Sequence, residues 1–365
     1  MGKYNIAVCG AFDVVSYGDS LFPVAIEAEL KNRIEEMGSI ILFSPKGTEH
    51  LYSNAQKVYS YDEFEKVNEI FHFNLIIVGG GELLHFVPIV FHAEDGTEIL
   101  YESGELWKRP IDFAKTKGIP YLINSVGVPN GFSREEAAIL LYYLSAASYV
   151  SVRDRYSYKR LVQIVPECEC VPDSLWNLNR YMKKETIIED RYIVIQYGTL
   201  FEIDELMFVI QEIRRQTNYQ IVVLPINYCH TDRLITEKAR EVLDDSTLIY
   251  DRQLDVHEIY NIIAGADLFI GTSLHGTLTA QVNGVPSVIF DMYPSVVGKM
   301  DGIYDWLAGD IYMISDVNTL PGIVQQVMEQ KDHRNEDIVF ELKEKTDRHF
   351  DRIAQCVYGG IGKNE

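Results

Sequence analysis

The sequence predicts an α/β protein made of two doubly wound domains, each a parallel sheet covered by helices. Strand-like apolar runs alternate with helical patterns along almost the whole chain, which is typical of βαβ units. A polar, charge-rich stretch at 179–191 breaks this alternation once, and 365 residues suit two medium domains. We therefore expect a first domain over 1–178, a linker over 179–191, a second domain over 192–332 and a C-terminal helical segment over 333–365 that braces them.

The first half contains short apolar runs that predict buried parallel strands. These runs lie at 4–10, 40–45, 74–81, 121–128, 149–154 and 167–173. The first helix is expected over 21–38 because Gly38 provides a stop signal. A later helix starts at Ser133, where Glu136 completes the pattern of a capping box.

The second half repeats the alternation without repeating the residues. Strand-like runs lie at 192–198, 220–227, 246–251, 267–273 and 286–292, and helical patterns lie at 203–216, 231–243 and 257–266 and after residue 273. The segment 336–358 has the pattern of a long amphipathic helix. Two such domains form a cleft between the carboxyl ends of their sheets, where ligands bind in folds of this class.

Charge and composition narrow the class of partner. A net charge of −21 repels nucleic acid and anionic lipid, so we expect no nucleic-acid partner and at most a peripheral membrane association. No apolar run approaches a membrane span and the N-terminus lacks a signal-peptide pattern, so a cytoplasmic location is expected. Five scattered cysteines indicate reduced thiols rather than a metal site. An anionic substrate would need a local basic site.

Polar residues follow several strands of the first domain. Asp19 either caps a helix or presents a carboxylate to the cleft. The turn Gly79–Gly81 is either a plain tight turn or a place where bare amides approach a ligand. Arg153 either forms a structural ion pair or holds a carboxylate or phosphate with its fork, and Asp173 ends the next strand.

Two candidates in the second domain occupy equivalent places. His275 follows Thr272 and Ser273 at a strand-to-helix junction, where it is either a packed residue or a proton donor and acceptor. Lys299 lies in a loop-helix after the following strand and is either a solvated lysine or a phosphate ligand. Because these features all follow strands and come from both halves, we expect them to meet in the cleft.

The order of the motifs resembles that of the polysaccharide pyruvyl transferase family. The motifs are "YGDSL", "GGGELLH", "SVRDRYS", "VPDSLWNL", "GTSLHGTLTAQVNGVPSVIF" and "VGKMDGIYDWL", which together cover roughly residues 4–316. The resemblance implies two Rossmann-like domains facing a central cleft, a GT-B-like fold. It also implies transfer of a pyruvyl group from phosphoenolpyruvate to two sugar hydroxyls of a cell-surface polysaccharide or its precursor, forming a ketal and releasing phosphate without a metal or other cofactor.

The resemblance also suggests a role for each candidate. His275 would be catalytic, Arg153, Ser273, Lys299, Gly80 and Gly81 would bind the donor, and Asp19 and Asp173 would bind the acceptor. The family usually has arginine where this chain has Ser273, so one cation for the donor is missing. Two alternatives therefore remain open: a GT-B-type glycosyltransferase that uses a nucleotide sugar, and a non-catalytic GT-B-like binding protein. The acceptor sugar and the oligomeric state are not predicted.

Overall fold

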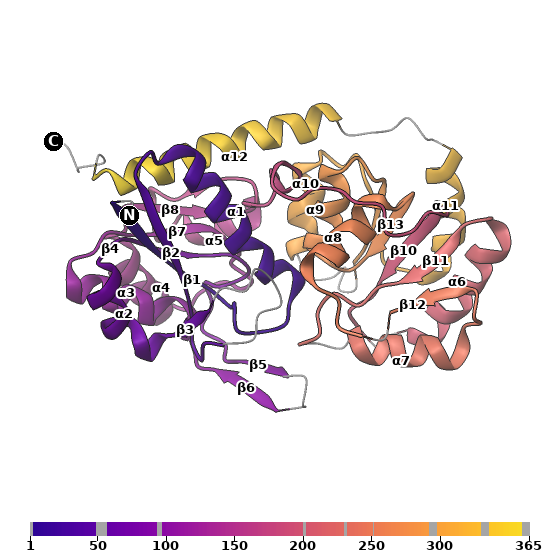
Figure 1. Cartoon of the computed structure of the whole chain (residues 1–365), viewed down its shortest axis with the longest axis horizontal. Coiled ribbons are helices and arrows are strands. Elements are labelled where there is room, and N and C mark those ends of the chain that lie inside the picture. The colour runs from indigo at the N-terminus through magenta and orange to yellow at the C-terminus, as the bar shows by residue number, and fades with distance from the viewer. Residues whose placement is uncertain are drawn as a thin grey trace.

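The computed structural model describes residues 3–48, 57–92, 97–199, 202–229, 232–250, 252–291, 298–329 and 336–359. Within them the chain forms two separate parallel sheets, one in each half of the sequence, with helices packed around each (Figure 1). The predicted α/β class with two doubly wound domains is therefore confirmed.

The first sheet has the strand order β3-β2-β1-β4-β7-β8-β9. Its strands are β1 (Tyr4–Cys9), β2 (Met37–Ser44), β3 (Val58–Ser60), β4 (Phe73–Gly79), β7 (Tyr121–Val126), β8 (Tyr149–Val152) and β9 (Glu169–Cys170). The helices of this half are α1 (Tyr17–Arg33), α2 (Phe64–Phe71), α3 (Glu105–Lys117), α4 (Arg134–Leu144) and α5 (Arg155–Leu161). An antiparallel hairpin of β5 (Ile89–His92) and β6 (Glu98–Tyr101) projects from it, in a region where no strand was predicted (Figure 1).

The second sheet has the order β12-β11-β10-β13-β14-β15. Its strands are β10 (Tyr192–Gln196), β11 (Gln220–Val223), β12 (Thr247–Ile249), β13 (Leu268–Gly271), β14 (Ser287–Phe290) and β15 (Tyr312–Ile314). The helices are α6 (Ile203–Gln216), α7 (Asp232–Val242), α8 (Val256–Gly265), α9 (Leu274–Val282), α10 (Lys299–Trp306) and α11 (Leu320–Glu329). Residues 181–191, which precede this sheet, contain no helix or strand. The limits of the domains stay predictions.

Each sheet contains one point where the direction of strand addition reverses. In the first sheet β1, β2 and β3 are added toward one edge, and β4 is then added on the other side of β1. In the second sheet β13 is added beside β10 in the same way. Loops at such a switch point diverge and leave a crevice at the carboxyl ends of the strands, which is where open α/β sheets bind ligands. The Gly79–Gly81 turn follows β4, and His275 follows β13.

Helix α1 joins the two domains through its first turn. The hydroxyl of Tyr17 lies 2.9 Å from Oγ1 of Thr279 in α9, and one apolar cluster continues from α1 into α8 and α9. The helix begins at Tyr17 and ends at Arg33, so the predicted span of 21–38 is wrong. Gly38 instead lies in β2, where a Cβ would come within 2.4 Å of Oδ1 of Asn5. This glycine permits close approach of the neighbouring strand and does not end the helix.

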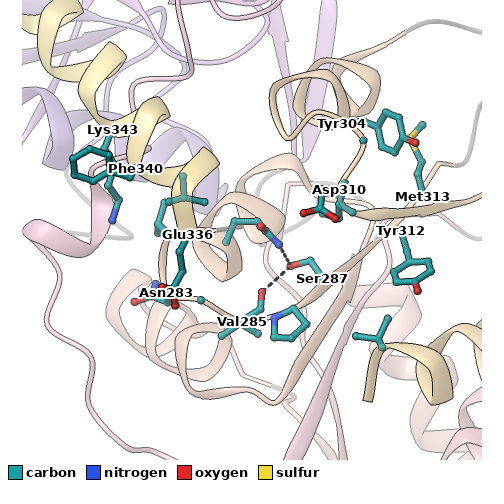
Figure 2. Close-up of a pocket in the computed structure, with 18 residues that line it drawn as sticks. Asn283, Val285, Ser287, Tyr304, Asp310, Tyr312, Met313, Glu336, Phe340 and Lys343 are labelled. Atoms are coloured by element: carbon teal, nitrogen blue, oxygen red, sulfur yellow. Dashed lines mark hydrogen bonds between the residues drawn. The ribbon is translucent and has the colours of Figure 1, made fainter. Parts of the chain in front are cut away.

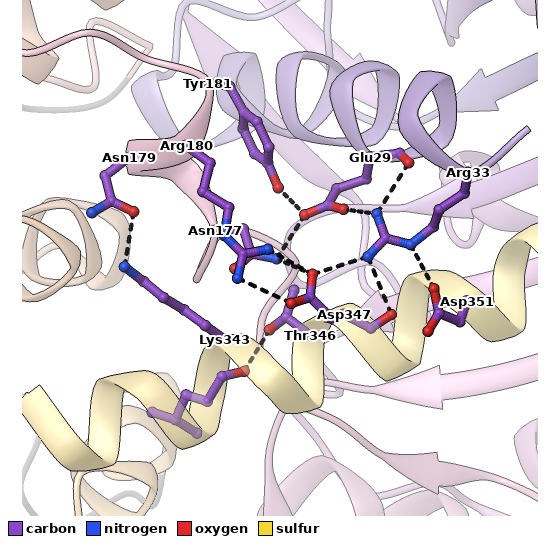
Figure 3. A network of polar contacts seen from close by, with 11 residues as sticks. Glu29, Arg33, Asn177, Asn179, Arg180, Tyr181, Lys343, Thr346, Asp347 and Asp351 are labelled. Carbon is purple, nitrogen blue, oxygen red and sulfur yellow. Dashed lines mark hydrogen bonds and ion pairs between the residues drawn. The ribbon is translucent and has the colours of Figure 1, made fainter.

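The long C-terminal helix α12 (Glu336–Val357) crosses from the second domain to the first (Figure 1). A partly buried polar network fixes it to α1 and to the segment that leaves the first domain (Figure 3). Asp347 accepts bonds from Arg33 (2.9 Å), Asn177 (3.0 Å) and Arg180 (2.7 Å). Asn177 also donates to Glu29 (2.7 Å), whose pKa burial raises above its usual value. The helix is therefore fixed to the first domain and to the segment that leaves it.

The structure also bears on the membrane. Within the described ranges, no helix combines the length and the apolar character that a bilayer crossing requires.

Candidate functional site between the domains

His275 lies in the first turn of α9, at the switch point of the second sheet. The N-cap of this helix is Ser273, whose hydroxyl accepts a bond from the Gly276 N–H at 3.2 Å. Such a cap satisfies one of the free amides at a helix start and fixes the direction in which the first turn leaves the strand. Ser273 thus has a local structural role, and the donor-binding role predicted for it stays a prediction.

The imidazole of His275 is held between the two domains. A Cβ placed on Gly18 would come within 1.8 Å of its Nδ1, so the ring lies directly on the backbone of α1. Phe22, one turn further along α1, meets the ring edge-on with centroids 5.2 Å apart. Nε2 faces Asp173, with 3.7 Å between Nε2 and Oδ2, and has no hydrogen-bond partner. The ring is therefore packed on one side and unsatisfied on the other.

Asp173 is buried at the carboxyl end of the first sheet. Its Oδ1 accepts the Leu175 N–H at 3.1 Å, while Oδ2 lies 3.7 Å from Arg153 Nη1 and has no hydrogen bond. Burial opposes ionisation, but the interactions with His275 and the charge of Arg153 outweigh it and lower the pKa of Asp173. Asp173 is thus a carboxylate at neutral pH and faces both a cation and the imidazole.

Arg153 is enclosed by carboxylates. Only 3% of its side chain is exposed, and it lies 3.5 Å from Glu82, 3.7 Å from Asp173 and 4.0 Å from Asp154. These separations exceed the 2.7–2.9 Å of a direct charge-assisted hydrogen bond, and Nε has no partner. Arg153 therefore compensates buried negative charge and retains unused donors.

Three polar atoms without a hydrogen-bond partner lie in this site: Arg153 Nε, Asp173 Oδ2 and His275 Nε2. Buried polar groups are rarely left unpaired, so this cluster is the strongest structural sign of a ligand site.

Glu82 is a member of the site that the sequence did not single out, although it lies in the "GGGELLH" motif. Burial opposes its ionisation, but the charges of Arg153 and then Lys299 lower its pKa below the usual value. A Cβ on Gly127 would come within 2.7 Å of Glu82 Cγ and 2.9 Å of Arg153 Nη2, so Gly127 makes room for this pair. Glu82 could have been selected from the sequence because it directly follows the glycine turn at the end of a predicted strand.

Lys299 comes from the second domain and closes the other side of the cluster. It is the first residue of α10, where Asp301 caps the helix by accepting the Gly298 N–H at 2.7 Å. A small void of about 10 Å³ is lined by Lys299, Arg153 and Asp173. Lys299 is exposed and has no ion pair or hydrogen bond among the described residues. It is the cation of the site most open to a ligand.

The glycine turn after β4 brings the backbone against α1. Gly80 and Gly81 have φ angles of +94° and +79°, which favour glycine, and a Cβ on Gly80 would come within 2.5 Å of Phe22. A Cβ on Gly81 would lie 3.1 Å from Oδ1 of Asp19. Asp19 lies in the first turn of α1, whose N-cap is Ser16, so the N-cap interpretation of Asp19 is wrong. Its carboxylate faces the glycine turn instead.

A strained buried serine supports the loop that carries Asp173. Ser125, the second-last residue of β7, has a φ of +47°, an unfavourable conformation for a residue with a side chain. Its N–H donates to Ser151 Oγ (2.9 Å) and its hydroxyl donates to the carbonyl of Pro172 (2.9 Å). Strain of this kind persists only where the surroundings fix it, and here it fixes the residue before Asp173. Nothing in the local sequence indicated this.

A larger cavity lies elsewhere. It measures about 740 Å³ and is formed by residues 281–287, Tyr304 and residues 309–313 together with Val327 and the first turns of α12 (Figure 2). Polar groups such as Asn283 and Ser287 already form hydrogen bonds within the protein, so this cavity lacks a cluster of unpaired polar atoms like the one around His275.

Nowhere in the described ranges do three or more histidine, cysteine, aspartate or glutamate side chains gather as possible metal ligands.

The fold and the interdomain site define a GT-B-like protein. UDP-GlcNAc 2-epimerase from Neisseria meningitidis bound to UDP-GlcNAc has a TM-score of 0.60 at 9% identity, over 99% of this chain and 100% of that one. S. aureus MnaA with UDP gives 0.61 at 9%, over 100% and 99%. The wall teichoic acid polymerase TagF gives 0.54 at 11%, over 98% and 88%. At these identities the likeness concerns the fold alone.

The sequence places the chain more narrowly. The family model described as polysaccharide pyruvyl transferase matches residues 17–292, well over half of the chain, so the chain belongs to the polysaccharide pyruvyl transferase family and is a transferase of polysaccharide biosynthesis. A comparison with curated proteins finds no significant match.

Proposed function

We propose that this protein transfers the pyruvyl group of phosphoenolpyruvate to two hydroxyls of a sugar in a cell-surface polysaccharide or its precursor, forming a ketal. The observation that carries the proposal is the unsatisfied cluster of Arg153, Asp173 and His275 between the two domains. It combines a group able to move protons with cations able to hold an anion, in a site largely shielded from water. Family membership supplies the class of reaction.

The reaction requires a proton at the methylene carbon of the donor. Protonated His275 would give this proton from Nε2, since Nδ1 lies against Gly18, and the donor carbon that bears the phosphate would become positively charged. Asp173, at 3.7 Å, would stabilise the imidazolium before transfer. The oxygen of the first sugar hydroxyl would then bond to that carbon, and its proton would return to His275. The second hydroxyl would displace phosphate, which leaves with the second proton.

The departing phosphate requires positive charge. Lys299 is the exposed cation of the site, and Arg153 contributes its field from behind the carboxylates. Glu82, Asp154 and Asp173 offset much of this charge, so the site holds an anion less strongly than one with an additional arginine at position 273 would. We therefore expect modest donor affinity, with Asp19 available to orient the acceptor.

The test measures phosphate released from phosphoenolpyruvate in the presence of simple hexose glycosides, and identifies the ketal by mass spectrometry. Wild-type protein should form it, and His275→Ala should lose at least 10²-fold in rate, the scale of general acid–base catalysis. Gly322→Ala is a matched control, because Gly322 is exposed in α11 with nothing within 4 Å of the added Cβ. Release of nucleotide from UDP-sugars without consumption of phosphoenolpyruvate would support the glycosyltransferase alternative instead.

A further inference from the structure

A buried histidine on the C-terminal helix has no part in the proposed mechanism. His349 lies in α12 and is only 2% exposed. Burial lowers the pKa of His349 to about 3, and the charge of Asp173 raises it by a smaller amount. The imidazole is therefore neutral at neutral pH, and it lies close enough to Asp173 to be affected by that charge.

Both nitrogens of this ring bond to the first domain. Nε2 of His349 lies 2.7 Å from Oδ1 of Asn124, an atom that can only accept, so Nε2 carries the proton. Nδ1 is then an acceptor, and it lies 3.1 Å from the hydroxyl of Tyr149. The ring therefore has one tautomer and one fixed orientation.

Asn124 connects this ring to the residue after Asp173. Its Oδ1 also accepts the hydroxyl of Ser174 at 3.3 Å, whereas its Nδ2 has no hydrogen-bond partner among the described residues. Asn124 and Ser174 are both fully buried, so water cannot replace a partner that is lost. Without His349, the Asn124 amide would be held only by the longer bond to Ser174.

Two consecutive residues near the end of β7 hold Asp173 from both sides. Asn124 accepts the bond from Ser174, which follows Asp173. Ser125 donates to the carbonyl of Pro172, which precedes it. The position of the Asp173 carboxylate in the interdomain site therefore depends on the end of this strand.

We infer that His349 is a positioning residue for Asp173 and acts through the Asn124 amide. The catalytic consequence rests on the proposed function, whereas the position of Asp173 can be measured without any substrate. In that function Asp173 stabilises the positive charge on His275. Its displacement should therefore slow turnover more than it weakens binding of the donor, which depends on the exposed cation of the site.

Crystal structures of the full chain and its variants test the position directly. His349→Leu removes both bonds of the ring, and Ser174→Ala breaks the same connection at its other end. In both variants Asp173 Oδ2 should move by about 1 Å or more from its place 3.7 Å from His275 Nε2. His349→Gln, which retains a donor and an acceptor, should keep the wild-type position.

Tyr149→Phe is the matched control, because it removes the bond at Nδ1 of His349 and leaves the bond between Nε2 and Asn124. It should lower the stability of the protein in urea unfolding but leave Asp173 in place. A merely structural role of His349 would instead predict that His349→Leu also lowers stability and leaves the site unchanged.

Turnover of phosphoenolpyruvate measures the catalytic consequence. In the folded proteins, His349→Leu and Ser174→Ala should lower kcat by roughly 10²-fold, with a KM for phosphoenolpyruvate within about twofold of the wild-type value. His349→Gln and Tyr149→Phe should keep a kcat close to that of the wild type.

The outcomes separate this inference from the proposed function. Displacement of Asp173 in the folded variants, without consumption of phosphoenolpyruvate by wild-type protein, would support the positioning role and reject pyruvyl transfer. An Asp173 carboxylate that keeps its place in either folded variant, or an unchanged kcat in an active protein, would overturn the positioning role. If His349→Leu fails to fold, Ser174→Ala decides, since that substitution lies outside α12.

Discussion

The contact between Gly18 and His275 makes a strong prediction about stability. In Gly18→Ala the new Cβ would lie 1.8 Å from Nδ1, whereas ordinary contact begins near 3.4 Å, so the ring or the helix must move by roughly 1.5 Å. Overpacking of this kind lowers the free energy of unfolding by about 1–3 kcal/mol. The higher helix propensity of alanine raises it by at most about 1 kcal/mol. We expect a net loss of about 1–2 kcal/mol in urea unfolding followed by tryptophan fluorescence.

A double-mutant cycle assigns that loss to the imidazole. With the ring removed in His275→Ala, the Gly18→Ala substitution should no longer destabilise, which gives a coupling energy of about 1–3 kcal/mol. Gly322→Ala, made in an exposed and open helical position, should stabilise by about 0.5–1 kcal/mol. If Gly18→Ala behaved like Gly322→Ala, or destabilised equally in both backgrounds, the packing of His275 on α1 would be refuted. Turnover by Gly18→Ala should fall by roughly 10²-fold, because a catalytic group misplaced by about 1 Å costs that much in rate.

Two further predictions concern charge. Burial raises the pKa of Asp232, the first residue of α7, to about 6, so its proton stabilises the fold at low pH, and this stability is lost as the pH rises from about 4 through 6. Asp232→Asn should therefore be more stable than wild type by about 1–3 kcal/mol at pH 8 and by little at pH 4, and a difference independent of pH in urea unfolding would contradict this. Glu82→Gln removes a negative charge beside Lys299 and Arg153 and should tighten phosphoenolpyruvate binding by about tenfold in calorimetry; weaker binding would show instead that Glu82 positions Arg153.

Local signals in the sequence predicted the elements that depend on neighbouring residues. The Ser133 cap with Glu136 forms as expected, with bonds of 3.2 and 2.8 Å, because a capping box involves one turn of chain. The end of the first helix was predicted wrongly at Gly38, because this glycine allows β1 to approach β2. That contact involves Asn5, a residue far away in sequence. The β5–β6 hairpin was missed because both strands are short and pair only with each other.

The candidate site, too, was predicted where the signal is local and missed where it depends on residues far apart in sequence. His275, Asp173 and Arg153 could be selected because each follows a strand of a predicted parallel sheet, and the structure brings them together. Gly18 could not be assigned its contact, since the residue that it touches lies in the other domain. His349 could not be selected either, because its partner Asn124 lies 225 residues away in sequence.

The central claim is that His275 delivers a proton to the donor at a site between the domains. The most direct measurement is proton NMR of phosphoenolpyruvate in D₂O with the protein and an accepted glycoside. Wild-type protein should produce a ketal whose methyl group carries one deuterium from the solvent, and His275→Gln should produce it at least 10²-fold more slowly. Formation of the labelled ketal by His275→Gln at the wild-type rate, or failure of wild-type protein to consume phosphoenolpyruvate with any glycoside, would contradict the claim.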